Sequence, residues 1–347
     1  MSGMHRPMCE KETAMQSNSW TPADLLQLSG GYWSACALHA GVKLDLFTPL
    51  TGSNLTVPDL AAIVKADSRG LAMLLDALTA MNLLEKGPDR YTATPFAAEY
   101  LCRTSPGYLG HIILHHHHLM EGWSHLDEAV RCGGPVQERV SHSNSEEYRE
   151  SFLMGMFNLA MLIAPRIVDS IDLAGRRRLL DLGGGPGTYA IHFCLQNPGL
   201  EAVIYDLPST RSFAEKTIER FSLSGRITFS SGDYLDEGIQ GRFDVAWLSH
   251  ILHGENPGGC AVILEKAVAA LEPGGMILVQ EFILADDKKS PLFPALFSLN
   301  MLQGTSSGQS YSEGELRSMM SAAGVGELRR IPLELPNGAG IIAGVRI

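Results

Sequence analysis

A glycine-rich turn between an apolar strand and a helix constrains the fold of this chain more than any other feature. In "RRRLLDLGGGPGTYAIHF", an apolar run ends at Leu182 and a helical run begins near Thr188. The glycines between them, Gly183, Gly185 and Gly187, would let backbone N–H groups approach a ligand closely. Apolar and helical runs then alternate through "RITFSSGD", "FDVAWLS" and "GGMILVQEFIL". This alternation predicts a parallel, doubly wound α/β sheet.

Acidic residues follow the next two predicted strands. Asp206 ends the strand after the glycine turn, about 20 residues further on, where a carboxylate can accept both hydroxyls of a nucleotide ribose. Asp233, in "GDYL", follows the third strand, where an adenine edge would lie. Thr188 stands where a nicotinamide site needs glycine or alanine, so a dinucleotide is a poor match. A tight turn without a ligand is disfavoured, because the loop and the acid occur together.

The first half of the chain is mostly helical. Helical periodicity starts after Thr21-Pro22, and another helix opens at Thr56 and Pro58. The next helix, "SRGLAMLLDALTAMNLLEK", is expected to end near Leu84, before the strand-like "RYTAT". Helix, turn, helix and a small β-wing are typical of a winged helix.

Four segments follow from these patterns. We expect a disordered tail over 1–20, a winged-helix domain over 21–105, a helical linker with pocket helices over 106–175, and the α/β domain over 176–347. The last segment should close with a β-hairpin around Asn337-Gly338.

Charge and cysteine content limit the function. The net charge of −11 argues against a nucleic-acid surface. A winged helix could bind DNA, but its second helix has only Arg69 and Lys86 as basic residues, one near each end. The six cysteines are scattered, without a CxxC pair, which favours a reducing cytoplasm. No stretch reaches about 18 uninterrupted apolar residues, so we expect no membrane partner. The charge distribution given above leads us to expect no nucleic-acid partner either.

The motifs together resemble one enzyme family. "LLDLGGGPGTYA", "YDLP", "SSGDYLDEG", "LSHILHGENPGGCAVILEKAVAALEPGGMILVQEFIL" and "FSLNMLQGTSSGQSYSEGEL" are similar to class I S-adenosylmethionine-dependent O-methyltransferases of the caffeic acid, acetylserotonin and hydroxyneurosporene type. The resemblance covers nearly the whole chain from about residue 20. It implies a Rossmann-like methyltransferase domain, S-adenosylmethionine as cofactor, a homodimer through the winged-helix domain, and a hydroxylated aromatic or polycyclic acceptor.

Two histidines in "LSHILHGENP" follow the predicted fourth strand. A phenol is protonated at neutral pH, and ionising it at pH 7 would cost about 4 kcal/mol. A histidine within hydrogen-bond reach removes that proton during the reaction. By resemblance, His253 is this general base and Glu281, at the end of the next strand, orients it.

The resemblance also assigns binding residues. For the cofactor they are Asp181, Gly183, Gly185, Asp206, Leu207, Gly232, Asp233, Tyr234, Ser249 and His250. For the acceptor they are Trp123, which could stack on a planar ring, Asn300, and the pair Phe152 and Met156. Phe152 and Met156 lie four residues apart on one helix face, so ordinary helix core is the competing interpretation.

Two positions depart from the family pattern. Gly254 follows the base where the family usually has aspartate, and Ser310 stands where plant members have glutamate. His253 would then be less firmly oriented, and Glu281 would carry more of that task. These departures keep open a relative that retains the cofactor but does not methylate. A ligand-sensing transcription regulator built on the winged helix is a weaker alternative.

Four consecutive histidines, His115 to His118, interrupt an apolar helical segment. Consecutive helical residues point about 100° apart, so these four side chains cannot converge on one ion, although His111 and His115 have the i, i+4 spacing of metal ligands. By resemblance the segment forms a wall of the acceptor pocket. We expect a mixed pocket wall and surface here; surface and subunit packing is the alternative, and a metal site is the least favoured interpretation.

Overall fold

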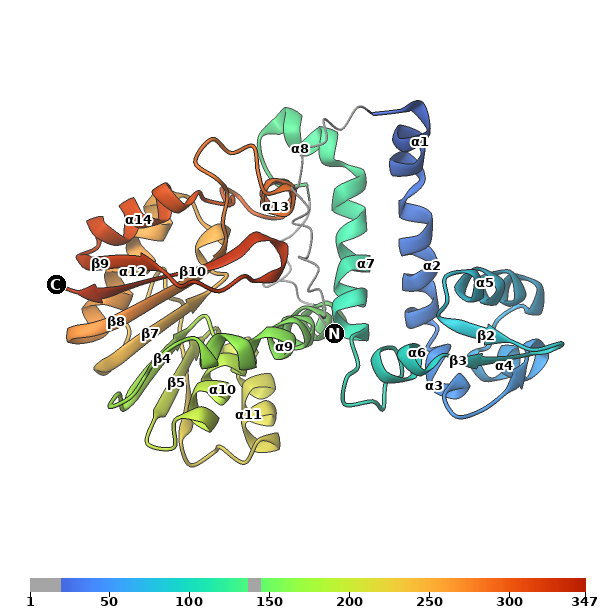
Figure 1. The fold of residues 1–347 in the computed structure, drawn as a ribbon, viewed down its shortest axis with the longest axis horizontal. Coiled ribbons are helices and arrows are strands. Elements are labelled where there is room, and N and C mark those ends of the chain that lie inside the picture. Colours follow the sequence, from blue (N-terminus) through green and yellow to red (C-terminus); the bar gives the residue numbers. More distant parts are fainter. Residues whose placement is uncertain (1–19, 137–144) are drawn as a thin grey trace, which may run out of the picture.

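The computed structural model describes residues 20–136 and 145–347, so the expected tail over 1–20 lies outside the described residues except for Trp20. An N-terminal helical lobe and a C-terminal α/β lobe lie at opposite ends of the molecule, and helix α7 (Gly110–Ser124) runs between them (Figure 1).

The N-terminal lobe combines short helices with a three-stranded sheet of order β1-β3-β2. Thr21 and Thr56 each close a capping box with an aspartate three residues later, which fixes the starts of two helices. The elements are α1 (Pro22–Gly30), α2 (Tyr32–Lys43), α3 (Phe47–Leu50), β1 (Leu55–Thr56), α4 (Val57–Val64), α5 (Ser68–Ala80), β2 (Leu84–Lys86), β3 (Arg90–Ala93) and α6 (Pro95–Tyr100).

The expected end of α5 near Leu84 is wrong. The helix ends at Ala80, and Leu84 instead begins β2, where it pairs with Ala93. Asn82 takes a left-handed φ of 59°, and the N–H of Leu83 donates to the carbonyl of Leu78. This closing turn stops the helix, because asparagine is one of the few residues that adopt a left-handed conformation readily.

Helices connect the lobes. After α7 come α8 (Leu126–Cys132) and α9 (Glu146–Asp169). Among the described residues, α9 is the helix long and apolar enough to cross a membrane by length and composition. Its apolar residues include Phe157, Ala164 and Ile167, which are buried inside the protein, and α9 packs on both α7 and α10 (Thr188–Gln196). These contacts bury part of α9 inside the protein.

The C-terminal lobe is a seven-stranded sheet of order β6-β5-β4-β7-β8-β10-β9. Its first five strands in that order are parallel, as the alternating pattern predicts. The antiparallel pairing of the last two strands along the chain confirms the predicted hairpin. The strands are β4 (Arg178–Leu182), β5 (Glu201–Asp206), β6 (Ile227–Ser231), β7 (Phe243–Ser249), β8 (Leu271–Phe282), β9 (Val325–Arg330) and β10 (Ala339–Arg346).

Apolar layers cover both faces of this sheet. On one face, Trp247 is fully buried against Tyr189 and Phe193 of α10. On the other, Leu180 and Leu248 belong to a cluster with Leu264 of α12 (Pro257–Ala270). Burial on both faces fixes the strand register, and thereby the positions of the loops at the strand ends. The remaining helices are α11 (Arg211–Arg220), α13 (Leu292–Gly304) and α14 (Glu313–Ala322).

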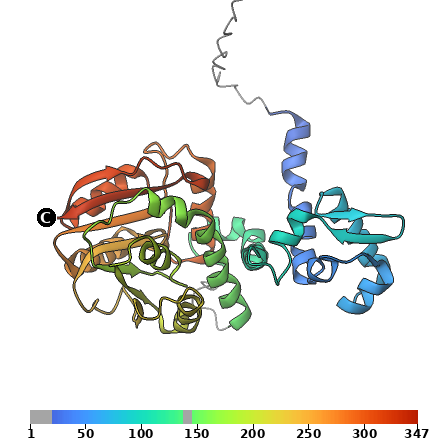
Figure 2. The same ribbon diagram turned by 60° about the horizontal axis from the view of Figure 1, so that its bottom comes forward.

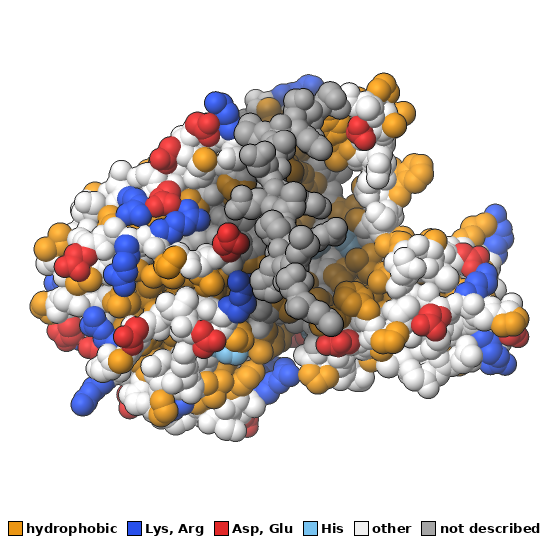
Figure 3. All heavy atoms as spheres, viewed as in Figure 1, with side chains coloured by type: hydrophobic (Ala, Val, Ile, Leu, Met, Phe, Trp, Pro, Cys, Tyr) orange, Lys and Arg blue, Asp and Glu red, His pale blue; other side chains and the backbone are white. Residues whose placement is uncertain are grey.

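The outer side of α1 and α2 is apolar and exposed. Leu26 is 73% exposed, Trp33 70% and Trp20 64%. Figure 2 shows α1 projecting from the N-terminal lobe, and Figure 3 shows hydrophobic side chains along this projecting edge. Large apolar side chains that are exposed together in this way are typical of an interaction site.

Candidate active site

The residues expected to bind the cofactor gather at one edge of the sheet. Parallel register aligns Asp206 at the end of β5 with Ser231 at the end of β6, and Ser249 at the end of β7 with Gln280 of β8. The glycine turn follows β4 at the same edge. In doubly wound sheets, ligands bind in the crevice outside the carboxyl ends of the strands.

The glycine turn has one packed side and one open side. A Cβ on Gly183 would lie 2.6 Å from Cγ2 of Ile251, and one on Gly187 would lie 2.3 Å from Cδ1 of Ile204. Gly185 has a φ of 55° and open space where its Cβ would be. This open side lies next to the first turn of α10, where backbone N–H groups favour a polar ligand group.

Asp206 ties the open side of the turn to β5. One carboxylate oxygen accepts the N–H of Gly185 at 2.7 Å, and the other accepts the N–H of Leu207 at 2.6 Å and the Thr210 hydroxyl at 3.2 Å. Burial raises the pKa of Asp206, and these three hydrogen bonds act in the opposite direction. Each carboxylate oxygen has further lone pairs with which it can accept ligand hydroxyls.

Asp181 lies beneath the turn. It is fully buried, and it accepts the N–H of Ala190 at 3.2 Å. A Cβ on Gly184 would lie 2.6 Å from the Asp181 carboxyl carbon. Burial raises the pKa of Asp181 to about 7. Its packing supports the shape of the turn, and its expected contact with the cofactor remains a prediction.

Hydrogen bonds to neighbouring residues hold the remaining cofactor candidates in place. The N–H of Gly232 donates to the Asp206 carbonyl at 3.0 Å, and Asp233 accepts the N–H of Leu235 at 2.8 Å. The Tyr234 carbonyl accepts the Lys266 ammonium at 2.9 Å, and the Ser249 hydroxyl pairs with the Gln280 carboxamide at 3.1 Å.

The predicted base and its orienting acid are in contact. Nδ1 of His253 lies 2.7 Å from Oε2 of Glu281. The other oxygen, Oε1, accepts the backbone N–H groups of Leu252 at 2.8 Å and His253 at 3.3 Å. Glu281 is only 1% exposed. Burial alone would raise the pKa of Glu281, but the His253 and His250 imidazoles hold it below its usual range, so the carboxylate is ionised.

His250 approaches the same carboxylate oxygen as His253. Its Nδ1 lies 3.6 Å from Oε2 of Glu281, and its ring packs on Phe282 at a centroid distance of 4.3 Å. The backbone of His250 has a φ of 57°, which is uncommon outside glycine and costs free energy. Such strain persists where the surrounding structure imposes it, as happens at functional sites.

Three phenylalanines line the approach to His253, and sequence reasoning missed them. The Phe297 ring meets the His253 ring edge-on at a centroid distance of 4.8 Å, and Phe282 lies 4.8 Å from Phe297. Phe293 contacts both of these rings. Phe293 and Phe297 lie four residues apart on α13, and Phe282 directly follows Glu281, so their spacing was the available signal.

Two of the predicted acceptor residues come together across the molecule. Nε1 of Trp123 on α7 donates to Oδ1 of Asn300 on α13 at 3.0 Å, and Gln303 donates to the same oxygen at 3.1 Å. Because the side-chain oxygen of Asn300 already accepts these two hydrogen bonds, its amide nitrogen is left to donate a hydrogen bond to a bound substrate. Phe152 lies against His115, with 5.3 Å between ring centroids, and Met156 is half-buried one turn further along α9.

The four consecutive histidines point to different neighbours, as expected. His117 contacts the Lys43 ammonium at 3.2 Å, while His118 pairs with the Ser151 hydroxyl at 2.9 Å and stacks on Tyr148. His115 is buried, and burial, with a smaller contribution from its histidine neighbours, lowers its pKa to about 3. These side chains do not converge on one point.

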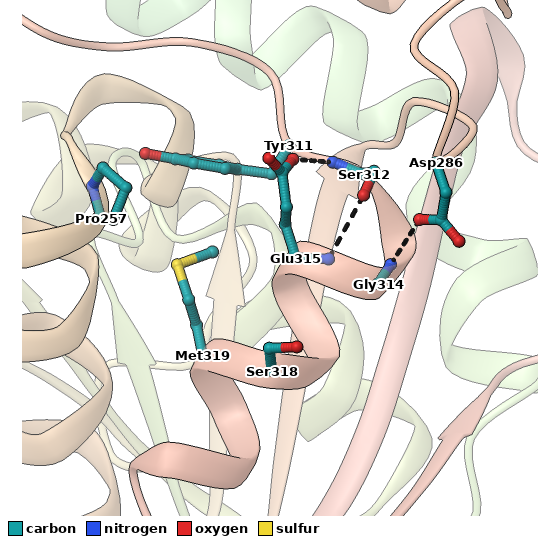
Figure 4. A pocket seen from close by; sticks show the side chains of 8 residues that line it. All are labelled: Pro257, Asp286, Tyr311, Ser312, Gly314, Glu315, Ser318 and Met319. Atoms are coloured by element: carbon teal, nitrogen blue, oxygen red, sulfur yellow. Dashed lines mark hydrogen bonds between the residues drawn. The ribbon is translucent and has the colours of Figure 1, made fainter.

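A hollow of about 410 Å³ beside α14 is lined by none of these residues (Figure 4). Its carboxylates are engaged: Asp286 accepts the N–H of Gly314 at 2.9 Å, and Glu315 accepts the N–H of Ser312 at 2.8 Å. Because these bonds already cap α14, the hollow offers little to a polar ligand. The candidate active site is therefore the sheet edge at the glycine turn, His253 and the three phenylalanines.

Comparison with known proteins identifies the family of this chain. An O-methyltransferase dimerisation domain matches residues 26–103, and an O-methyltransferase domain matches residues 123–326. The chain is 34% identical to 3-hydroxy-5-methyl-1-naphthoate 3-O-methyltransferase of Streptomyces sahachiroi, over 94% of this chain and 95% of that protein. It is 31% identical to the tetracenomycin polyketide synthesis 8-O-methyl transferase of Streptomyces glaucescens, over 91% and 95%.

Among solved structures, human N-acetylserotonin methyltransferase in complex with S-adenosylmethionine superposes with a TM-score of 0.84. The match has 26% identity and covers 96% of this chain and 99% of that one.

Proposed function

This chain belongs to the family of S-adenosylmethionine-dependent O-methyltransferases with an N-terminal dimerisation domain, and from that premise we propose that it methylates a phenolic hydroxyl with His253 as general base. The family acts on small aromatic and polyketide substrates. The observation that carries the proposal is the 2.7 Å contact between His253 and the buried Glu281 carboxylate.

This contact determines which nitrogen of His253 acts. An ionised carboxylate can only accept hydrogen bonds. Nδ1 of His253 therefore carries the ring proton and donates its hydrogen bond to Glu281. The lone pair of the neutral ring is then on Nε2, which takes the phenolic proton as the oxygen bonds to the methyl carbon. Glu281 stabilises the imidazolium that results. The buried, ionised carboxylate supports this role, although Gly254 replaces the family's usual acid.

When bound, S-adenosylmethionine supplies a methyl group on a positively charged sulfur, which leaves as a neutral thioether. The open space at Gly185 and the Asp206 carboxylate would hold the nucleoside, since the turn leaves room there and the carboxylate has further oxygen lone pairs at the switch point of the sheet. The other cofactor candidates lie near the ends of strands or directly after them, at the same edge.

The side chains around His253 indicate which kind of methyl acceptor the site would bind. Phe282, Phe293 and Phe297 stack or meet edge-on beside His253 and favour a planar aromatic ring. The amide nitrogen of Asn300 would donate to a second oxygen of the acceptor. The naphthoate and tetracenomycin relatives support an aromatic or polycyclic molecule. The test is the transfer of a labelled methyl group to a panel of phenols.

We also propose that the apolar side of α1 and α2 buries itself in a homodimer. Light scattering at micromolar concentration should give the mass of two chains. Paired substitutions Leu26→Asp and Trp33→Asp should yield monomers, because they place charges in an apolar interface. Leu195→Asp, on the exposed side of α10, is the matched control and should leave the dimer intact. A monomeric parent protein would refute the proposal.

The five described cysteines are all unpaired, which supports a reducing cytoplasm as the proposed location.

A further inference from the structure

A second histidine shares the carboxylate of the proposed base. Nδ1 of His250 and Nδ1 of His253 lie 3.6 Å and 2.7 Å from Oε2 of Glu281. One donor atom from each of these three residues lies within 4.8 Å of the other two. Across residues 20–136 and 145–347, no other trio of His, Cys, Asp or Glu side chains gathers in this way.

The cluster has an unused donor atom next to a buried negative charge. Nδ1 of His250 is buried and has no hydrogen-bond partner, because 3.6 Å exceeds hydrogen-bond length. A buried polar atom without a partner costs free energy unless something occupies it. A cation between the imidazoles and the carboxylate would satisfy the His250 nitrogen and neutralise Glu281.

The donor set selects the kind of cation. Two imidazole nitrogens and one carboxylate oxygen, with a fourth position open, are a zinc set and not a magnesium or calcium set. Tetrahedral bonds of about 2.0–2.1 Å place donor atoms about 3.3 Å apart. The distance of 3.6 Å between His250 Nδ1 and Glu281 Oε2 is already near this separation. The distance of 2.7 Å between His253 Nδ1 and Glu281 Oε2 must increase by about half an ångström to reach it.

We propose that His250, His253 and Glu281 form a binding site for a divalent ion of the zinc class, and that its occupation switches off the base. The second half rests on the proposed role of His253. A metal bound at Nδ1 forces the ring proton onto Nε2. That nitrogen then donates and cannot accept a phenolic proton, so metal binding and base catalysis exclude one another.

The metal site is tested without any acceptor. Chelator-treated enzyme is titrated with Co²⁺, whose tetrahedral complexes absorb visible light far more strongly than its octahedral ones. We expect one equivalent to give the tetrahedral spectrum and Zn²⁺ to displace it. His250→Asn should lose the spectrum, since asparagine tolerates the positive φ but lacks the imidazole. Glu281→Gln, a second variant, should lose it too. His117→Asn is the matched control on α7 and should keep it.

Three results would overturn the site: no tetrahedral spectrum in the parent enzyme, a spectrum that survives in both His250→Asn and Glu281→Gln, or its loss in His117→Asn. The consequence for the base is measured separately. With a phenol that the enzyme methylates, Zn²⁺ should abolish turnover in proportion to occupancy, and a chelator should restore it. If Zn²⁺ fully occupies the site and turnover stays unchanged, His253 is not the base, but the metal site itself is not refuted.

Discussion

His253→Ala is expected to lower turnover at pH 7 by about 10²–10⁴-fold, the range that a general base contributes. The phenol then has to ionise unaided, which is unfavourable three pH units below a pKa near 10. Affinity for S-adenosylhomocysteine should change little, because the His253 ring packs among phenylalanines and not on the glycine turn. Steady-state kinetics and titration calorimetry separate the two effects.

The pH dependence gives this experiment its control. As pH rises toward 10, a growing fraction of the phenol is ionised, so His253→Ala should recover part of its turnover. Glu281→Gln should lose less than His253→Ala at pH 7, because it keeps the shape but removes the charge that stabilises imidazolium. His125→Ala changes an exposed histidine that pairs with Glu128 and should behave as the parent enzyme. Full activity of His253→Ala at pH 7, with tight cofactor binding, would contradict the assignment.

Asp206→Ala should have the second large effect, a loss of cofactor affinity. Two hydrogen bonds from ribose hydroxyls to a charged oxygen contribute about 1.5–3 kcal/mol each, which corresponds to about 10²–10⁴-fold in affinity for S-adenosylhomocysteine. Part of the loss will come from the turn itself, because Asp206 also ties down Gly185 and Leu207.

The control for this variant is Asp169→Ala, which removes an exposed aspartate at the end of α9 that pairs with Gln196. It should leave affinity unchanged, as measured by calorimetry. An unchanged affinity in Asp206→Ala would remove the ribose assignment.

The sheet and its glycine turn were predictable because they depend on local patterns. Apolar β-branched runs separated by helices specify a parallel sheet, and the chemistry of such a sheet lies at the carboxyl ends of its strands. His253 follows β7 and Glu281 lies near the end of the neighbouring strand β8, so their contact follows from topology. The end of α5 was misplaced because the apolar pattern continues past Ala80, whereas the left-handed turn at Asn82 stops the helix.

The acceptor side was less predictable because it is assembled from distant segments. Trp123 and Asn300 are hydrogen-bonded although 177 positions separate them. Phe293 and Phe297 were missed because only the packing of α13 brings Phe297 against the His253 ring. His250 was assigned to the cofactor by resemblance, but only the structure shows its Nδ1 approaching Glu281 at 3.6 Å.

The most direct test of the central claim follows the methyl group. Enzyme is incubated with S-adenosylmethionine labelled with ¹³C in the methyl group and a panel of naphthols and polycyclic phenols, each paired with its fully methylated ether. We predict that the label appears as an aryl methyl ether, with one S-adenosylhomocysteine formed per ether, and that the ether controls remain unlabelled. If the cofactor binds but the label reaches nitrogen or carbon, or reaches none of the phenols, the account of His253 as base for phenol methylation is wrong.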